Sequence, residues 1–150
     1  MTSTLWVIVA TVSGVIVLLV ILKMIFRSMA RSLQAEVRQR FHASKILRQE
    51  PFANFFGRKS RGLKQVRGNG ALVLTRETLW FMRAAPRKEF TIPLDHVTGV
   101  TFHKTFLGKT IFRPLLCVEF ETKDGPDAIA WAVRDPHAWR EAIDAARKGG

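Results

Sequence analysis

An apolar run near the N-terminus is long enough to cross a membrane. Leu5 to Leu22 reads LWVIVATVSGVIVLLVIL, eighteen residues without a charged side chain, and Lys23 follows at once. At ~1.5 Å per residue, a helix that continues to Phe26 while Lys23 reaches toward the surface spans the ~30 Å hydrocarbon core of a bilayer. Residues 1–26 are therefore predicted to form a single transmembrane signal-anchor helix.

A cleaved secretory signal is the alternative to an anchor. Such signals carry positive charge before a shorter apolar core and small residues at the cleavage site. In this chain no charge precedes Lys23, and the small residues Ser28 and Ala30 lie beyond the first cations. An anchor fits better. The positive-inside rule then predicts that the N-terminus is outside a cell or inner membrane and that the following domain is cytoplasmic.

The positive charge is concentrated beside the apolar run. Residues 23–67 contain twelve Lys and Arg against Glu36 and Glu50, a net charge of +10, whereas residues 68–150 have a net charge of +2. Cations at this place attract an anionic leaflet at about 1 kcal/mol each. They also fix the topology without binding any lipid specifically, so both roles stay open.

Residues 27–50 are predicted to form a basic amphipathic juxtamembrane helix that ends before Pro51. The helix could continue the anchor, lie on the bilayer surface or pack against a partner helix. Its apolar side chains recur at every fourth position and are the candidates for a partner-helix contact: Met29, Leu33, Val37 and Phe41.

Residues 51–62 are predicted to be a basic and aromatic linker that continues in character to Arg67. Rings beside cations suit a membrane interface, and stacking on nucleic-acid bases would use the same residue types. The rings could also simply cover one end of the following domain. The membrane-interface candidates are Phe52, Phe55 and Phe56, and the candidates for binding lipid phosphate are Arg58, Lys59, Arg61, Lys64 and Arg67.

Residues 63–150 read as an α+β domain that is mainly β, with about seven antiparallel strands. Alternating apolar residues indicate a sheet with one wet face, and Asn69-Gly70 predicts a tight hairpin. Pro114 is expected to break a strand or to lie at an edge. The predicted strands are Leu63–Arg67, Ala71–Thr75, Leu79–Met82, Glu89–Ile92, Val97–His103, Ile111–Thr122 with its break, and Asp127–Val133.

The chain ends in a predicted amphipathic helix. Asp135 is a suitable N-cap, Pro136 suits the first turn, and Gly149 follows the last turn. Trp139 and Ile143 lie on its apolar face, which must cover the open side or end of the sheet.

The pattern resembles the pleckstrin-homology-like superfold, in particular its GRAM and bacterial branches. The resemblance covers residues 63–148 and is carried by Gly70–Thr75, Leu79–Phe81, Ile92–Val97 and Trp139. It implies a barrel or sandwich that is capped by the final helix. Domains of this fold that bind lipid headgroups often do so near the first hairpin, and many others bind peptides or have no known ligand. No particular phosphoinositide signature is present, and a fold does not by itself give a function.

Enzymatic constellations are sparse. Cys117 is the single cysteine, which excludes an internal disulfide. Glu119 and Glu121 share one strand face, the geometry that paired carboxylates need for acid–base catalysis, but a solvated strand face explains them equally well. No glycine-rich phosphate loop is present. We therefore expect no enzyme, no cofactor, no small-molecule substrate and no specific nucleic-acid partner. No metal site is expected either, because the histidines lack ligand spacing: His42, His96, His103 and His137.

These observations predict a non-enzymatic single-pass membrane protein. Its cytoplasmic module would bind anionic lipid, a protein partner or both. The alternative is a structural or accessory subunit of a larger membrane complex, which would assemble through the anchor and the juxtamembrane helix.

Overall fold

The computed structural model describes residues 2–149, which form two compact units divided between Ser32 and Leu33. The helix α1 (Thr2–Arg40) supplies all of the first unit and the beginning of the second. The apolar side chains of its first part are exposed, with a mean hydropathy of 2.9 in the most apolar window. Within the described residues, α1 is the one helix long and apolar enough to cross a membrane by length and composition.

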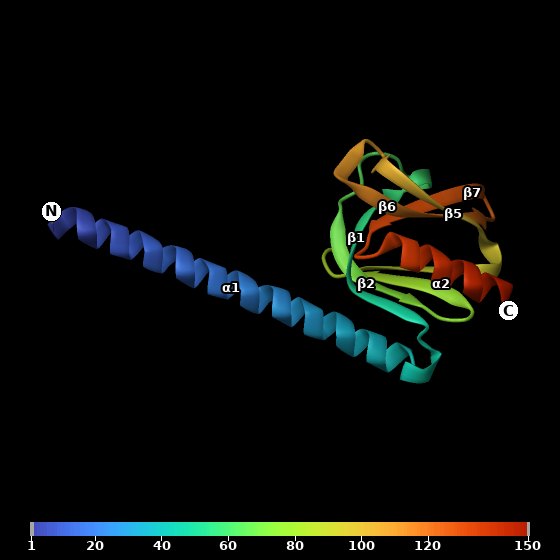
Figure 1. The fold of residues 1–150 in the computed structure, drawn as a ribbon, viewed down its shortest axis with the longest axis horizontal. Coiled ribbons are helices and arrows are strands. Elements are labelled where there is room, and N and C mark those ends of the chain that lie inside the picture. Colours follow the sequence, from blue (N-terminus) through green and yellow to red (C-terminus); the bar gives the residue numbers. More distant parts are fainter. Residues whose placement is uncertain (1, 150) are drawn as a thin grey trace. The chain divides into compact units, whose positions relative to one another are not determined.

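The second unit is built on one antiparallel sheet of seven strands that curls into a half-barrel (Figure 1). The strand order is β4-β3-β2-β1-β7-β6-β5, so the first strand in the chain lies at the centre of the sheet. The strands are β1 (Arg48–Arg58), β2 (Gly68–Leu74), β3 (Thr78–Arg83), β4 (Lys88–Pro93), β5 (Val97–Phe106), β6 (Lys109–Thr122) and β7 (Gly125–Ala132).

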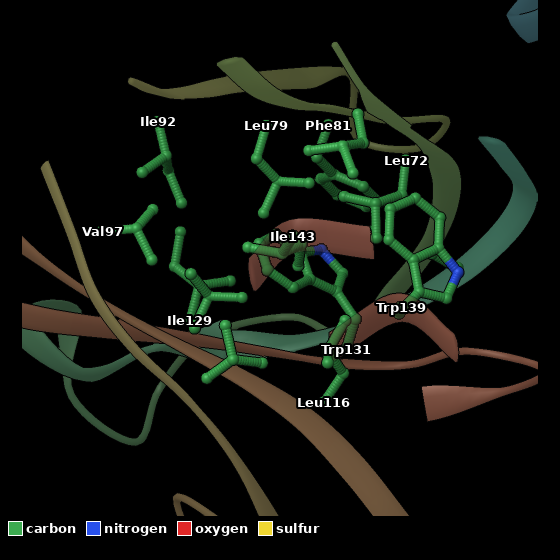
Figure 2. Packing of buried hydrophobic residues seen from close by; sticks show 14 of the residues in the cluster. Leu72, Leu79, Phe81, Ile92, Val97, Leu116, Ile129, Trp131, Trp139 and Ile143 are labelled. Carbon is green, nitrogen blue, oxygen red and sulfur yellow. The ribbon is translucent and has the colours of Figure 1, made fainter. Parts of the chain in front are cut away.

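The helix α2 (Pro136–Lys148) fills the concave side of the sheet. As predicted, the Asp135 side chain caps it by accepting the Ala138 N–H at 3.0 Å, and Pro136 occupies its first turn. Figure 2 shows Trp139 and Ile143 between side chains of β2–β4 and those of β5–β7. Both are fully buried, so the core forms only when the helix and both halves of the sheet come together.

Three short 3₁₀ turns connect these elements: η1 (Ala43–Lys45), η2 (Lys59–Arg61) and η3 (Leu94–His96). Two regions of the outer face of the sheet carry further apolar clusters. On one, Leu33 and Val37 from the end of α1 pack on Val73 and Trp80. On the other, Phe56 and neighbours on β6 and β7 are covered by Phe106 and Ile111 of the β5–β6 hairpin. The domain therefore has apolar packing on both sides of its sheet.

The structure corrects the predicted boundaries before residue 63. The helix ends at Arg40 rather than at Glu50, and β1 replaces both the end of the predicted helix and most of the predicted linker. Pro51 was expected to stop a helix, but it lies inside β1. The strand accommodates Pro51 because the register with β2 shifts between Glu50 and Ala53, which leaves it outside the regular pairing.

The first predicted strand and its hairpin are also wrong. Leu63–Arg67 is a loop, and Asn69-Gly70 lies inside β2, where Asn69 is opposite Asn54 of β1. Gly70 serves close packing instead of a turn, since a Cβ there would lie 2.2 Å from the Met82 carbonyl oxygen. The later strands agree with the prediction in place and direction. Pro114 lies in a bulged part of β6, between the register pairs His103–Leu115 and Thr105–Thr110.

Candidate functional site

The structure separates the three phenylalanines that were candidates for a membrane interface. Phe55 and Phe56 are 1% and 0% exposed, and they belong to the inner and outer apolar clusters, respectively. The prediction that these two rings enter a membrane is therefore wrong for the folded domain, because the sheet needs them for its own packing. Phe52 remains 40% exposed.

Much of the apolar stripe of the juxtamembrane helix packs on the sheet of its own domain. Leu33 and Val37 are 4% and 1% exposed, and Phe41 packs edge-on against Trp80 with ring centroids 5.4 Å apart. Leu33 and Val37 are therefore unavailable to a partner helix. Met29 belongs to the other compact unit.

Polar contacts hold the same helix end to its own domain. Gln49 of β1 donates to Gln34 at 2.9 Å, while Glu36 pairs with Arg87 and Arg40 pairs with Glu89. These contacts reach β1, the β3–β4 turn and β4. The last turns of α1 are therefore a structural part of the domain.

The five cations that were candidates for binding lipid phosphate do not form one cluster. Arg58 forms an ion pair with the buried carboxylate of Asp127, so its role is structural. Lys59 lines a cavity of about 470 Å³ on the outer side of β5–β7. The Arg67 guanidinium lies 3.9 Å from the centre of the Phe56 ring. Arg61 lines one cavity of mixed charge with Arg58, Glu89 and Glu121, and it lines a second cavity together with Lys64.

That cavity has a volume of about 420 Å³ and lies between the β1–β2 connection and the β3–β4 hairpin. Four cations line it together with Phe55, Gln65, Val66 and Phe90, and no carboxylate among the described residues lines it. We call this cavity the basic pocket. Its four cations are Arg61, Lys64, Arg83 and Lys88.

The electrostatics of the basic pocket favour an anion. Burial lowers the pKa of Lys88, and the positive charges of Arg61, Arg83 and Arg58 lower that pKa further. Like charges gathered around one ammonium group repel each other until an anion lies between them. Arg83 is held in place because it donates to the carbonyl oxygens of Pro86 at 2.9 Å and Val66 at 2.7 Å.

The loop of residues 62–67 is ordered beside this pocket. The Gln65 side chain accepts the Arg58 N–H at 2.9 Å and donates to the Arg58 carbonyl at 2.7 Å, while Lys109 donates to the Gln65 carbonyl at 2.7 Å. Leu63 and Val66 nevertheless remain 67% and 61% exposed. The loop thus presents apolar side chains next to cations, which is the chemistry of a membrane interface.

Sequence reasoning missed Arg83 and Lys88 because it recognised their strands without considering the charges at the turn between them. The run Arg87-Lys88 was visible, but only the hairpin places Lys88 opposite Arg61. Leu63 and Val66 were missed as interface residues because they were assigned to a strand.

Groups suited to catalysis are few among residues 2–149. Thr101 Oγ1 lies 3.1 Å from His103 Nε2 and donates to Glu119 Oε1 at 3.2 Å, whereas Glu121 is exposed. Burial raises the pKa of the Cys117 thiol to about 11, so the thiol is protonated at neutral pH and is a poor nucleophile. No group of three His, Cys, Asp or Glu residues within the described range could hold a metal ion.

Neither family models nor curated proteins match this chain. Among solved structures, it is similar to a chain of the 8S snRNP assembly intermediate, with a TM-score of 0.53, 13% identity, and coverage of 71% of this chain and 85% of that one. It is also similar to the C-terminal domain of an unknown protein from Leishmania infantum, with a TM-score of 0.50, 14% identity, and coverage of 85% and 98%.

A third similar structure is the crystal structure of human RhoA in complex with the DH/PH fragment of PDZRHOGEF. The TM-score is 0.50, the identity 13%, and the match covers 71% of this chain and 29% of that chain. The domain has a pleckstrin-homology-like fold. Identities this low establish the fold of the PH-like domain and carry no ligand or activity over to it.

Proposed function

We propose that this chain is a single-pass membrane protein whose cytoplasmic PH-like domain binds anionic lipid and acts by binding rather than by catalysis. The observation that carries the proposal is the basic pocket, a cavity lined by four cations and by no carboxylate among the described residues. A phosphate-bearing headgroup is the ligand that such a cavity fits.

The exposed side chains of the neighbouring loop support a lipid surface as the source of that phosphate. Leu63 and Val66 flank Lys64, so apolar groups would enter the headgroup level while Lys64 and Arg61 meet phosphates. The length and hydropathy of α1 support an anchor that keeps the domain at such a surface.

Within the superfold, we propose that the domain belongs to the GRAM-like branch. The Ile92-Pro93-Leu94 step supports this assignment, because it leads from β4 into η3 with Ile92 and Leu94 buried. The GRAM-like pattern of the sequence includes this same step.

The test is co-sedimentation of residues 33–150, the second compact unit, with neutral and phosphatidylserine-containing vesicles. We expect the combined change Arg61→Glu, Lys64→Glu and Lys88→Glu to weaken binding by about a hundredfold or more, since each surface cation contributes about 1 kcal/mol. A matched control reverses three exposed cations elsewhere in the domain: Arg38, Lys45 and Arg76.

Equal losses in the two variants would mean that general electrostatics, and not this pocket, holds the domain to lipid. Absence of binding by the unaltered domain, once thermal denaturation shows that it is folded, would refute the lipid proposal. We would then expect the domain to bind a protein partner instead of lipid.

A further inference from the structure

A second cationic hollow lies on the outward side of β1. Phe52 and Asn54 line it and alternate along the strand with Ala53 and Phe55, which point into the core. The hollow has a volume of about 550 Å³ and extends to the end of β7 and the bulge of β6. Since none of its lining residues lines the basic pocket, it is a separate site.

We call this hollow the arginine groove. Three arginines line it: Arg67, Arg113 and Arg134. None of them forms an ion pair with a carboxylate in the described part of the chain. Glu50 is the one acid in the lining, and its buried carboxylate accepts the Arg134 backbone N–H at 3.2 Å. The lining therefore has a net positive charge, and its guanidinium groups are suited to bidentate pairing with carboxylates.

A strained and exposed aromatic residue lies in the chain between Ile111 and Arg113, which line the arginine groove. Phe112 is 93% exposed and has a φ of 59°, a conformation that bulky residues rarely adopt. Thr110 Oγ1 maintains it by accepting the Phe112 N–H at 3.0 Å and donating to the Lys104 carbonyl at 2.6 Å. A ring held in this way makes no contribution to the core, so the strain indicates a role in recognition.

The walls of the groove offer further groups for an extended ligand. Phe52 is exposed on β1, and the side-chain oxygen of Asn54 is buried without a hydrogen-bond donor among the described residues. An extended peptide can place an apolar side chain against Phe52, whereas the Asn54 oxygen is inaccessible to it in this structure. Carboxylates on such a segment match the three guanidinium groups of the groove in charge and in bidentate geometry.

We propose that the arginine groove binds a short, extended, acidic segment of a partner protein, in which carboxylates flank an apolar side chain. The carboxylates pair with Arg67, Arg113 and Arg134, and the apolar side chain lies against Phe52. This proposal does not depend on lipid binding by the basic pocket.

The test measures fluorescence anisotropy of a fluorescein-labelled peptide of glutamates around one leucine, mixed with the full chain in an uncharged detergent. We expect saturable binding, and we expect the same peptide with glutamines in place of glutamates not to bind. Arg113→Gln should weaken binding about tenfold, as expected for one charge-assisted pair. Arg113 is exposed, so its replacement leaves the fold intact. Phe52→Ser should also weaken binding, because Phe52 lines the groove and is 40% exposed.

A matched control removes the exposed charge of Arg76, which lies outside the groove, by Arg76→Gln. The proposal is overturned if this variant loses as much affinity as Arg113→Gln, or if the glutamine peptide binds equally well. Displacement of the peptide by phosphatidylserine vesicles from the Arg61→Glu, Lys64→Glu, Lys88→Glu variant would assign the groove to lipid instead. Retention of peptide binding by that variant is expected, and it separates this test from the test of the basic pocket.

Discussion

At the scale of single residues, Asp127 determines how the β1–β2 connection begins. Its carboxylate has a side-chain exposure of 2% and pairs with Arg58. It also accepts the Ser60 N–H at 2.9 Å, the Ser60 hydroxyl at 2.7 Å and the Ala128 N–H at 2.9 Å. These bonds keep η2, and with it Arg61, beside β7. Asp127 is thus a positioning residue for the basic pocket.

The hydrogen bonds of Asp127 predict how stability depends on pH. Burial alone would raise the pKa of this carboxyl, but the bonds from Ser60, Arg58 and Ala128 outweigh burial and hold the pKa below the ordinary value of 3.8. Because the folded-state pKa is lowered, the stabilisation is present above about pH 4 and is lost as the pH falls through the folded-state pKa.

We expect Asp127→Asn to lower the free energy of unfolding by about 1–3 kcal/mol at neutral pH. The difference from the unaltered protein should shrink on acidification below about pH 4, where the carboxylate itself becomes protonated. Thermal denaturation of both proteins across this pH range measures the difference. Curves that stay parallel down to about pH 3 would contradict the role assigned to the charge.

At the scale of elements, the end of α1 is a structural part of the domain. Leu33 packs on the outer face of the sheet near Trp80, and Gln34 and Glu36 bond to β1 and to the β3–β4 turn. A helix that is apolar along one narrow stripe is stabilised chiefly by such tertiary packing. Without this contact the outer surface of Trp80 would be open to solvent.

We therefore expect Leu33→Ala to destabilise the domain by about 2–5 kcal/mol, as for other buried leucines. Urea denaturation of the full chain in detergent, followed by tryptophan fluorescence, measures the loss. Leu47→Ala is the matched control, because Leu47 is 47% exposed and should change stability little. Equal effects of the two substitutions would show that the helix end does not stabilise the sheet.

Sequence patterns predicted most elements from residue 71 onward, because their strands alternate and the final helix has clear caps. They failed for residues 41–70. The spacing of Leu33, Val37 and Phe41 at every fourth position led to a predicted helix that continues past Arg40. In the structure the helix ends at Arg40, and the Phe41 ring packs against that of Trp80. The run Arg48–Arg58 lacks alternation because Phe55 and Phe56 pack on opposite faces of β1 while Phe52 stays exposed, and its pairing with β7 is long-range. Such a central strand has no local signature.

The candidate site was predictable only in part for the same reason. Arg61 and Lys64 were found from the charge run, since they lie in an exposed loop. Lys88 and Arg83 joined them only through the β3–β4 hairpin, and Arg58 left the group because Asp127, far along the chain, neutralises it. Partners that meet through strand pairing do not appear in a local charge count.

At the scale of the whole molecule, most of the net positive charge lies in the first half of the chain. Lys23, Arg27 and Arg31 directly follow the apolar part of α1, where cations decide which end of a helix stays in the cytoplasm. The orientation proposed here therefore depends on a few residues outside the PH-like domain.

We expect protease treatment of sealed membrane vesicles to show a C-terminal epitope on the cytoplasmic side. Combined Lys23→Gln, Arg27→Gln and Arg31→Gln should produce a mixed orientation. Removing three charges far along the chain, at Lys104, Lys123 and Arg147, should leave the orientation unchanged. An epitope on the opposite side in the unaltered protein would reverse the assigned topology.

The long β1 strand limits how this domain can be exchanged between proteins. A recombination point at Pro51 would look natural from composition, yet it would divide β1 and discard the helix end that covers Trp80. A junction before Leu33 keeps every partner of the sheet together. The portable unit in a chimera is therefore the sheet together with the last two turns of the helix that leads into it.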